Sequence, residues 1–469
     1  MSSKTTPAPA SDGLGRGLFA STDLAIGETV LHISTPFVAV LDKPRLEDTC
    51  SGCLGKRHLG SYENTLKACR GCHVVKYCDK TCQSKDWKFA HSLECGIYQQ
   101  LQPRILPINA RAVLRMVLRN GRKKYGTEEM KLFLELETHI KDIRDENEAQ
   151  WQRIALCSKA VKTYAGTEMQ EEFISAFGAK LDLNSFNLTN AVYDRIGVYL
   201  HPYAALINHS CTANAVVGFE GDELYVKALR PIAKGDQIFI SYVDATNPYS
   251  VRRTELRGRY YFDCRCERCQ TESSSAPTSS ETAATTNNHH PHHRPIPPPA
   301  HFPPTPITTQ PSVSLRDELI VSLLTQGKFK TAFAHATIRY TRIDPVVYAP
   351  HHPIRQLHAW SLSKLAILLS QGVDVSHRSS SDDDEEEVAL EKFEVNLGLI
   401  IWAVLGELVA GEERACTVPG FKGLVREAFG QVHGEFLAGG LDPRAMGAEV
   451  KREWGKVGRL VDEVLEREG

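Results

Sequence analysis

Four neighbouring polar residues interrupt two apolar runs in the segment HPYAALINHSCTANAVV, which covers residues 201–217. They are Asn208, His209, Ser210 and Cys211, and their side chains form hydrogen bonds or bind metals. The apolar runs on both sides suit a buried sheet. This pattern predicts a functional site held between buried segments.

The cysteines of residues 50–95 stand in pairs that have the spacing of zinc ligands. Each pair leaves two or three residues between its members, so that a tight turn presents two donors at once. A segment this short, with few large apolar side chains, hardly folds without metal. Two tetrahedral zinc sites are therefore expected from Cys50, Cys53, Cys69, Cys72, Cys78, Cys82, His91 and Cys95.

The three cysteines of CRCERC, residues 264–269, leave a closed zinc site one ligand short. We predict that Cys211 is the fourth ligand, because such a site would hold the chain after residue 260 against Asn208 and His209. The alternative is that Cys211 is a buried free thiol. The predicted third ligand set is Cys211, Cys264, Cys266 and Cys269.

The chain has 469 residues and a formal net charge of −2, a balance that favours neither nucleic acid nor an anionic membrane as partner. The N-terminal stretch MSSKTTPAPASDG lacks the apolar core of a secretory signal, so the 13 cysteines are expected to stay mostly reduced. Cys157 and Cys416, far from other candidate ligands, are interpreted as small buried hydrophobes. The run NLGLIIWAVLGELVAG, interrupted by Glu407, is too short to cross a bilayer and predicts a buried helix.

Periodicity and composition indicate the elements that position these residues. Residues 27–40, GETVLHISTPFVAV, alternate like a half-buried strand pair, and strand character returns over about residues 190–243. Apolar residues at helical spacing predict helices in residues 101–180 and again from residue 314 to the end. Residues 271–313 are rich in Ser, Thr, Pro and His, which predicts a disordered linker.

Several of these motifs together resemble one protein family. The segments INHSC with the following Asn214, GDQIFISY and CRCERC resemble the SET domain of protein lysine methyltransferases with its post-SET zinc site, and GLGRGLFA at 13–20 resembles its N-terminal motif. The ligand order that ends in CRGCHVVKYCDKTCQSKDWKFAHSLEC resembles a MYND zinc finger. The chain thus resembles the SET and MYND domain family of methyltransferases, strongly over residues 10–270 and beyond them only in helical character.

The resemblance implies an α+β fold: a SET-type β fold split by a MYND zinc finger and a helical insert, with a post-SET zinc loop and an all-α C-terminal lobe. The implied parts are the N-terminal part of the SET domain (1–49), the MYND finger (50–95), the helical insert (96–185), the SET core (186–250), the post-SET loop (251–270), the disordered linker (271–313) and the helical C-terminal domain (314–469).

The resemblance also implies how the zinc ligands are shared. Ligand pairs are interleaved in MYND fingers, so His58 and His73 stay outside the sites and three zinc ions are expected in all. The first finger site is then Cys50, Cys53, Cys78 and Cys82, and the second is Cys69, Cys72, His91 and Cys95.

S-adenosylmethionine is the cofactor that the resemblance to SET domains implies. An amide such as that of Asn208 suits the amino acid end of this cofactor, because it both donates and accepts hydrogen bonds. Gly15 lets the backbone approach closely, and Arg16 adds a positive charge. The implied cofactor-binding residues are Leu14, Gly15, Arg16, Asn208, His209, Tyr242, Tyr260 and Phe262.

Tyr242, at the end of IFISY, is the implied catalytic residue, with its hydroxyl beside the transferred methyl group. Tyr260 and Phe262 are expected to flank the cofactor and the lysine channel, and packing around the zinc loop is the alternative for both. Two features depart from the family: TAN stands where a proline usually precedes the asparagine, and a long linker precedes the C-terminal lobe. Substrate choice is therefore the property that transfers least.

The predicted function is S-adenosylmethionine-dependent protein-lysine N-methylation of histone or non-histone proteins, as a chromatin regulator in the nucleus, the cytoplasm or both. The MYND finger and the C-terminal lobe are candidate sites for peptide partners, and no membrane association is expected. One alternative is a non-catalytic SET and MYND scaffold or transcriptional co-regulator, which the presence of Asn208 and Tyr242 opposes. The other is nucleic-acid binding, which eight Lys and Arg against four Asp and Glu in residues 50–95 suggest and the near-neutral chain opposes.

Overall fold

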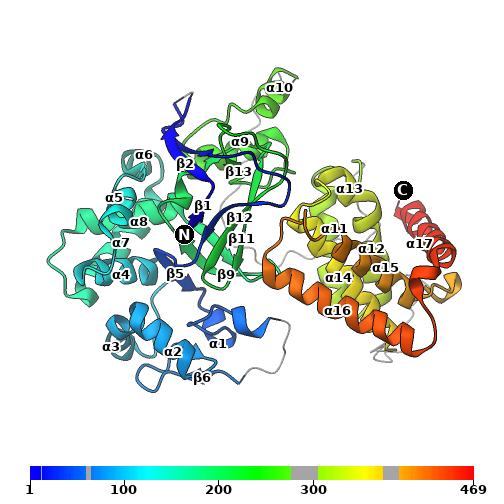
Figure 1. The fold of residues 1–469 in the computed structure, drawn as a ribbon. Coiled ribbons are helices and arrows are strands. Elements are labelled where there is room, and N and C mark those ends of the chain that lie inside the picture. The colour runs from blue at the N-terminus through cyan, green and yellow to red at the C-terminus, as the bar shows by residue number, and fades with distance from the viewer. Residues whose placement is uncertain (12, 60–64, 276–304, 373–389, 469) are drawn as a thin grey trace. The chain divides into compact units, whose positions relative to one another are not determined.

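The computed structural model describes residues 1–11, 13–59, 65–275, 305–372 and 390–468. The chain divides into two compact units (Figure 1). All the expected cofactor-binding residues, from Leu14 to Phe262, lie in the first unit. The first unit comprises Met1–Val243, Arg253–Cys264 and Cys416–Phe421, and the second comprises Asp244–Arg252, Arg265–Ala415 and Lys422–Gly469.

Short sheets form the centre of the first unit. The largest has four strands in the order β1-β4-β12-β11, and a three-stranded sheet has the order β5-β9-β8. Along β12, buried and partly exposed residues alternate, as expected of a strand with one covered face. The strands are β1 (Ser2–Ser3), β2 (Thr5–Pro9), β3 (Arg16–Ala20), β4 (Thr29–Ile33), β5 (Val38–Leu41), β6 (Lys67–Ala68), β7 (Lys76–Tyr77), β8 (Phe186–Thr189), β9 (Arg195–Leu200), β11 (Ala215–Glu220) and β12 (Glu223–Ala228).

Residues 27–40 form two strands, as predicted, but the two are not a pair. β4 pairs with β1 and β12, whereas β5 pairs with β9 in another sheet. Pro36 lies between them, and a proline has no N–H with which to continue a ladder. All four residues of β5 are buried, so this strand is not half-buried either.

The predicted site segment is held by a short parallel pair, β10 (Asn208–His209) with β13 (Phe239–Ile240). Asn214 locks this pair from the side, because its Nδ2 donates to Gln237 O at 2.8 Å and its Oδ1 accepts from Phe239 N at 2.8 Å. The polar segment is therefore fixed at the backbone level by residues about thirty positions further along the chain.

Buried arginines fasten the helical insert to the free edge of β5. Arg111 Nη2 donates to Leu41 O and Arg115 Nη1 donates to Ala39 O, both at 2.7 Å. The two arginines stand one turn apart on α4, so one helix face supplies both donors. The helices before β8 are α1 (Arg45–Asp48), α2 (Lys80–Asp86), α3 (Ser92–Leu101), α4 (Ile108–Gly121), α5 (Thr127–Leu134), α6 (Ile140–Glu146), α7 (Glu148–Ala165) and α8 (Glu171–Asn184).

The second unit is helical, as predicted from residue 314 onward. The apolar run of α15 forms a helix with buried residues such as Leu405, which confirms the prediction of a buried helix. No described helix is long and apolar enough to span a membrane. The remaining helices are α9 (Tyr249–Tyr260), α10 (Glu267–Ser275), α11 (Ser312–Thr325), α12 (Phe329–Ile338), α13 (Asp344–Val347), α14 (Pro353–Ser370), α15 (Leu397–Ala410), α16 (Pro419–Ala438) and α17 (Gly447–Glu468).

The predicted linker, residues 271–313, is described only at its two ends. Its first residues belong to α10, which continues to Ser275, and its last two begin α11 at Ser312. Residues 276–304 lie outside the described residues.

Candidate active site and metal centres

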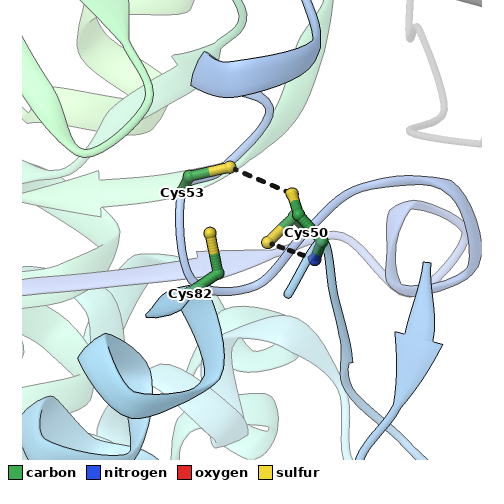
Figure 2. Close-up of side chains that lie close together, drawn as sticks. Cys50, Cys53 and Cys82 are labelled. Carbon is green, nitrogen blue, oxygen red and sulfur yellow. Dashed lines mark hydrogen bonds between the residues drawn. The ribbon is translucent and has the colours of Figure 1, made fainter. Parts of the chain in front are cut away.

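Four thiols converge in the first predicted finger site, which consists of Cys50, Cys53, Cys78 and Cys82. Their sulfur atoms all lie within 4.8 Å of one another, and Figure 2 shows three of these side chains together. The sulfurs of Cys53 and Cys78 are 3.6 Å apart, close to the roughly 3.8 Å that separates thiolates around one tetrahedral zinc ion. The hydrogen bond between Cys50 and Cys53 lowers the pKa of Cys50 and raises the pKa of Cys53.

The second finger site has the predicted mixed ligand set. Cys69, Cys72, His91 and Cys95 bring their ligand atoms within 4.8 Å of one another, and all four residues are buried. His91 Nε2 lies 3.4 Å from Cys69 Sγ and 3.6 Å from Cys72 Sγ. The residues of the finger thus gather in the two groups that interleaved pairing predicts.

The finger is tied to the helical insert next to its last zinc ligand. Glu94, beside Cys95, accepts hydrogen bonds from Arg115 Nε and Nη2 at 2.6 and 2.7 Å. Because Arg115 also donates to Ala39 O, one buried guanidinium joins the finger, α4 and β5. The fully buried Glu94 carboxylate has its charge matched by this bidentate pair.

Much of the finger's positive charge is neutralised within the chain. Lys85 lies 2.7 Å from Asp222, and Lys56 forms ion pairs with Glu220 and Glu223 of the β11–β12 hairpin. The finger residues Arg57 and Lys76 pair with Asp79 and Glu47. The basic excess of residues 50–95 therefore serves partly to hold the finger on the hairpin, which weakens the nucleic-acid interpretation.

The third predicted ligand set also comes together. Cys211, Cys264, Cys266 and Cys269 place their sulfur atoms within 4.8 Å of one another. The sulfurs of Cys211 and Cys264 are 4.0 Å apart, although 53 residues separate them in the chain. The three groups, each with four N or S donors, fit three zinc ions.

His209 lies between the third cysteine group and Tyr242. Its Nδ1 accepts a hydrogen bond from the Tyr242 backbone N at 3.0 Å, so the ring proton belongs on Nε2, which lies 3.3 Å from Cys211 Sγ. The side chain of Asn208 donates to Arg16 O at 3.1 Å. The NHSC segment therefore connects the N-terminal glycine motif, Tyr242 and a zinc ligand.

Tyr242 stands in a small aromatic cluster. Its ring centre lies 4.9 Å from that of Tyr260, 5.3 Å from that of His209 and 6.4 Å from that of Phe262. Its hydroxyl donates to Ile207 O at 2.6 Å, and burial raises its pKa above the ordinary value for tyrosine. The phenol is therefore neutral at physiological pH and has its proton committed to a carbonyl.

A pocket opens beside Tyr242, with a volume of about 150 Å³. Its lining combines amide and hydroxyl groups with aromatic and aliphatic side chains and one arginine. Phe186 and its neighbours at the start of β8 belong to this lining and were not expected from the sequence. The lining residues are Leu183, Asn184, Ser185, Phe186, Asn187, Ala205, Ile207, Ile240, Ser241, Tyr242, Arg259 and Tyr260.

The glycines of GLGRG have different roles. Gly15 has φ of +70° and open space where a side chain would stand, whereas a Cβ on Gly17 would lie 2.3 Å from Gln237 Nε2. Arg16 pairs at 2.8 Å with Glu135, so its predicted charge is balanced within the chain. Gly17 is thus the glycine that another side chain approaches closely, a contact that the sequence alone did not indicate.

The predicted cofactor site passes a test of fit. Gln237 Nε2 is buried beside Gly17 and Asn208, and no described residue pairs with it. A buried donor without a partner is costly and calls for a ligand or water. The open space at Gly15 and the polar side chain of Asn208 suit a small polar ligand at this position.

Comparison with known proteins adds independent support. Residues 15–243 match the SET domain family. The chain is 32% identical over 272 residues to histone-lysine N-methyltransferase SMYD3 of Homo sapiens, which covers 56% of this chain and 60% of that protein. It is 30% identical over 265 residues to SET domain and MYND-type zinc finger protein 6 of Schizosaccharomyces pombe, covering 56% of this chain and 52% of that protein.

A third relative also resembles the chain over just over half of its length. N-lysine methyltransferase SMYD2-B of Danio rerio is 29% identical over 268 residues, covering 56% of this chain and 60% of that protein. The SET domain of LSMT bound to lysine and AdoHcy aligns over 93% of this chain and 88% of that one, but at 13% identity and a TM-score of 0.25, too low to support an argument.

The matches cover only part of each relative. The chain spans between half and three fifths of the length of these relatives. The matched span carries a SET domain, and the predicted resemblance to SET and MYND lysine methyltransferases is confirmed.

Proposed function

We propose that this protein is an S-adenosylmethionine-dependent protein-lysine N-methyltransferase with Tyr242 as its catalytic residue. The observation that carries the proposal is the pocket beside Tyr242, placed in a SET domain next to the NHSC segment. The relatives named above include a histone-lysine and an N-lysine methyltransferase, which supports the same reaction class.

Asn208, one of the residues proposed to bind the cofactor, lies beside the buried and unpartnered Gln237 Nε2. Asn208 and the backbone of Gly15 and Arg16 would hold the amino acid end of the cofactor, and His209, Tyr260 and Phe262 would flank it together with Leu14. When bound, S-adenosylmethionine supplies an electrophilic methyl group on a sulfonium. The chain's own task is to align the incoming amine and to exclude water.

Delivery of a neutral lysine is the main energetic obstacle. At about pH 7.4, deprotonating an amine with a pKa near 10.4 costs about 4 kcal/mol. Among the described residues that line the pocket, none is Asp or Glu, so no lining carboxylate stabilises the ammonium form. Burial between Phe186, Tyr242 and Tyr260 would lower the pKa of the lysine and favour the neutral amine.

Tyr242 is proposed to orient the reacting groups through its oxygen. Its hydroxyl proton is donated to Ile207 O, so the oxygen offers only lone pairs to whatever enters the pocket. The raised pKa of Tyr242 keeps this oxygen neutral. A neutral oxygen would be a weak acceptor for a C–H of the polarised methyl group or for the N–H of the amine. A negative oxygen there would instead stabilise the ammonium form of lysine.

The remaining assignments complete the proposal. Zinc at the two finger sites would stabilise the finger, and zinc at the third would hold the NHSC segment, with no metal in the reaction itself. The predicted domain limits, peptide binding by the finger and the C-terminal lobe, and a nuclear or cytoplasmic location are part of the same proposal. Histone and non-histone proteins both remain in the proposed substrate class.

The test is methyl transfer from radiolabelled S-adenosylmethionine to a lysine-centred peptide library with randomised flanks. We expect label on lysine peptides and none on the matched library in which arginine replaces the central lysine. Absence of label on every lysine peptide, from protein that binds the cofactor, would contradict the enzymatic proposal and favour a scaffold.

A further inference from the structure

The pocket beside Tyr242 has one charged residue in its described lining. Apart from Arg259, its lining side chains are apolar, aromatic, hydroxyl or amide groups. Arg259 is exposed and belongs to the last turn of α9, one residue before Tyr260. A single positive group therefore stands at the solvent side of the pocket proposed to receive lysine.

The guanidinium of Arg259 packs on an aromatic ring, but no described carboxylate pairs with it. It lies over the Tyr260 ring, 5.2 Å from the ring centre, in a cation–π arrangement. The neighbouring Arg253 and Arg257 both pair with Asp263, at 3.1 and 2.5 Å, so that carboxylate is already engaged. In the described part of the chain, Arg259 itself forms no salt bridge.

The second charged residue that acts on Tyr260 is Glu255, which lies one turn earlier on α9. Burial raises the pKa of Tyr260; the charge of Arg259 opposes this rise and the charge of Glu255 adds to it. Glu255 does not line the pocket, whereas Arg259 does. A peptide whose lysine enters the pocket therefore meets the arginine rather than the glutamate.

We propose that Arg259 selects substrates in which an acidic residue lies next to the methylated lysine. This inference rests on the proposed function and adds the substrate class. A guanidinium binds a carboxylate through two parallel hydrogen bonds, and its stacking on Tyr260 reduces the entropy lost on binding. Lysines within runs of Lys and Arg would instead bring like charges to Arg259 and are disfavoured.

The experiment measures kcat and KM for two peptides that differ only in the residues beside the lysine, glutamate in one and arginine in the other. Wild type is expected to have a kcat/KM about fivefold higher for the glutamate peptide, because its KM for that peptide is lower. This ratio is the most that one solvent-exposed ion pair usually contributes. Arg259→Glu is expected to reverse this preference. The control Arg104→Glu has the same charge change at an exposed residue outside the pocket lining, and should keep the wild-type preference.

Affinities of the same two peptides, measured by fluorescence anisotropy, separate this inference from the proposed function. A preference that is unchanged in Arg259→Glu, or equal in Arg104→Glu and Arg259→Glu, would overturn the role of Arg259. If wild type binds the glutamate peptide more tightly in an Arg259-dependent way but transfers no methyl group, the selectivity stands and the proposed function fails.

Discussion

The zinc finger and the pocket beside Tyr242 are built in opposite ways. All eight finger ligands come from residues 50–95, in local pairs that a turn can present. The pocket takes its walls from the end of α8 with β8, from Ala205 and Ile207 before the NHSC segment, from β13 with Tyr242, and from the end of α9. A change in the finger should therefore act on folding, whereas a change in the pocket should act on chemistry.

The largest effect is expected from breaking a finger site. Cys72→Ser removes a fully buried ligand, and the module has little core to replace the lost zinc. We expect the loss of at least one zinc ion per chain and a fall in the free energy of unfolding of about 3 kcal/mol or more. Metal analysis measures the zinc content, and thermal unfolding measures the loss of stability.

Cys157→Ser is the matched control, because this cysteine belongs to none of the three groups. It should keep the full zinc content. If Cys72→Ser retained three zinc ions and its melting temperature, the finger would not depend on metal and the contrast with the pocket would collapse.

An intermediate effect is expected at Cys211, because this residue belongs to a predicted zinc site and also lies beside the residues that hold Tyr242. Its sulfur joins the third group, and it lies 3.3 Å from the His209 ring that holds the Tyr242 backbone. Cys211→Ser should lose one zinc ion and weaken cofactor affinity about tenfold or more, as changes around metal ligands do. Calorimetric titration with the cofactor checks this, and unchanged affinity alongside lost zinc would separate the metal from the pocket.

The smallest effect is expected at Glu223, which pairs with Lys56 of the finger. Although partial burial opposes it, hydrogen bonds from Lys56, Tyr225 and His32 lower the pKa of Glu223 to about 2. A carboxyl with a lowered pKa stabilises the fold above its ordinary pKa near 4.5, and this stabilisation is lost as the pH falls toward 2.

Glu223→Gln should therefore cost at most about 1 kcal/mol near neutral pH, since the pair is partly exposed. The difference in unfolding free energy from wild type should shrink as the pH falls below 4.5. A loss as large as that of Cys72→Ser would mean that ion pairs, rather than zinc, hold the finger.

This contrast also explains what the sequence could predict. Ligand spacing is a local property, so the members of all three four-residue groups were predicted, including Cys211, which completes the third group. The motif resemblance likewise brought Asn208 and Tyr242 to one site.

Features that depend on chain packing were missed. Gly17 matters because Gln237 approaches it from a segment more than two hundred residues away, and Phe186 enters the pocket only through the pairing of β8 with β9. The prediction that β4 and β5 pair with each other was wrong, because alternation indicates a strand but does not identify the strand beside it. No pattern in the sequence contains that information.

Tyr242→Phe tests the central claim most directly, because it keeps the ring and removes only the hydroxyl that donates to Ile207 O. Single-turnover methyl transfer to one accepted peptide should fall by about two orders of magnitude, with little change in cofactor affinity or melting temperature. Tyr164→Phe, which removes a hydroxyl outside the pocket lining, should keep the wild-type rate. A Tyr242→Phe rate near that of wild type would show that the hydroxyl is structural and would contradict the account.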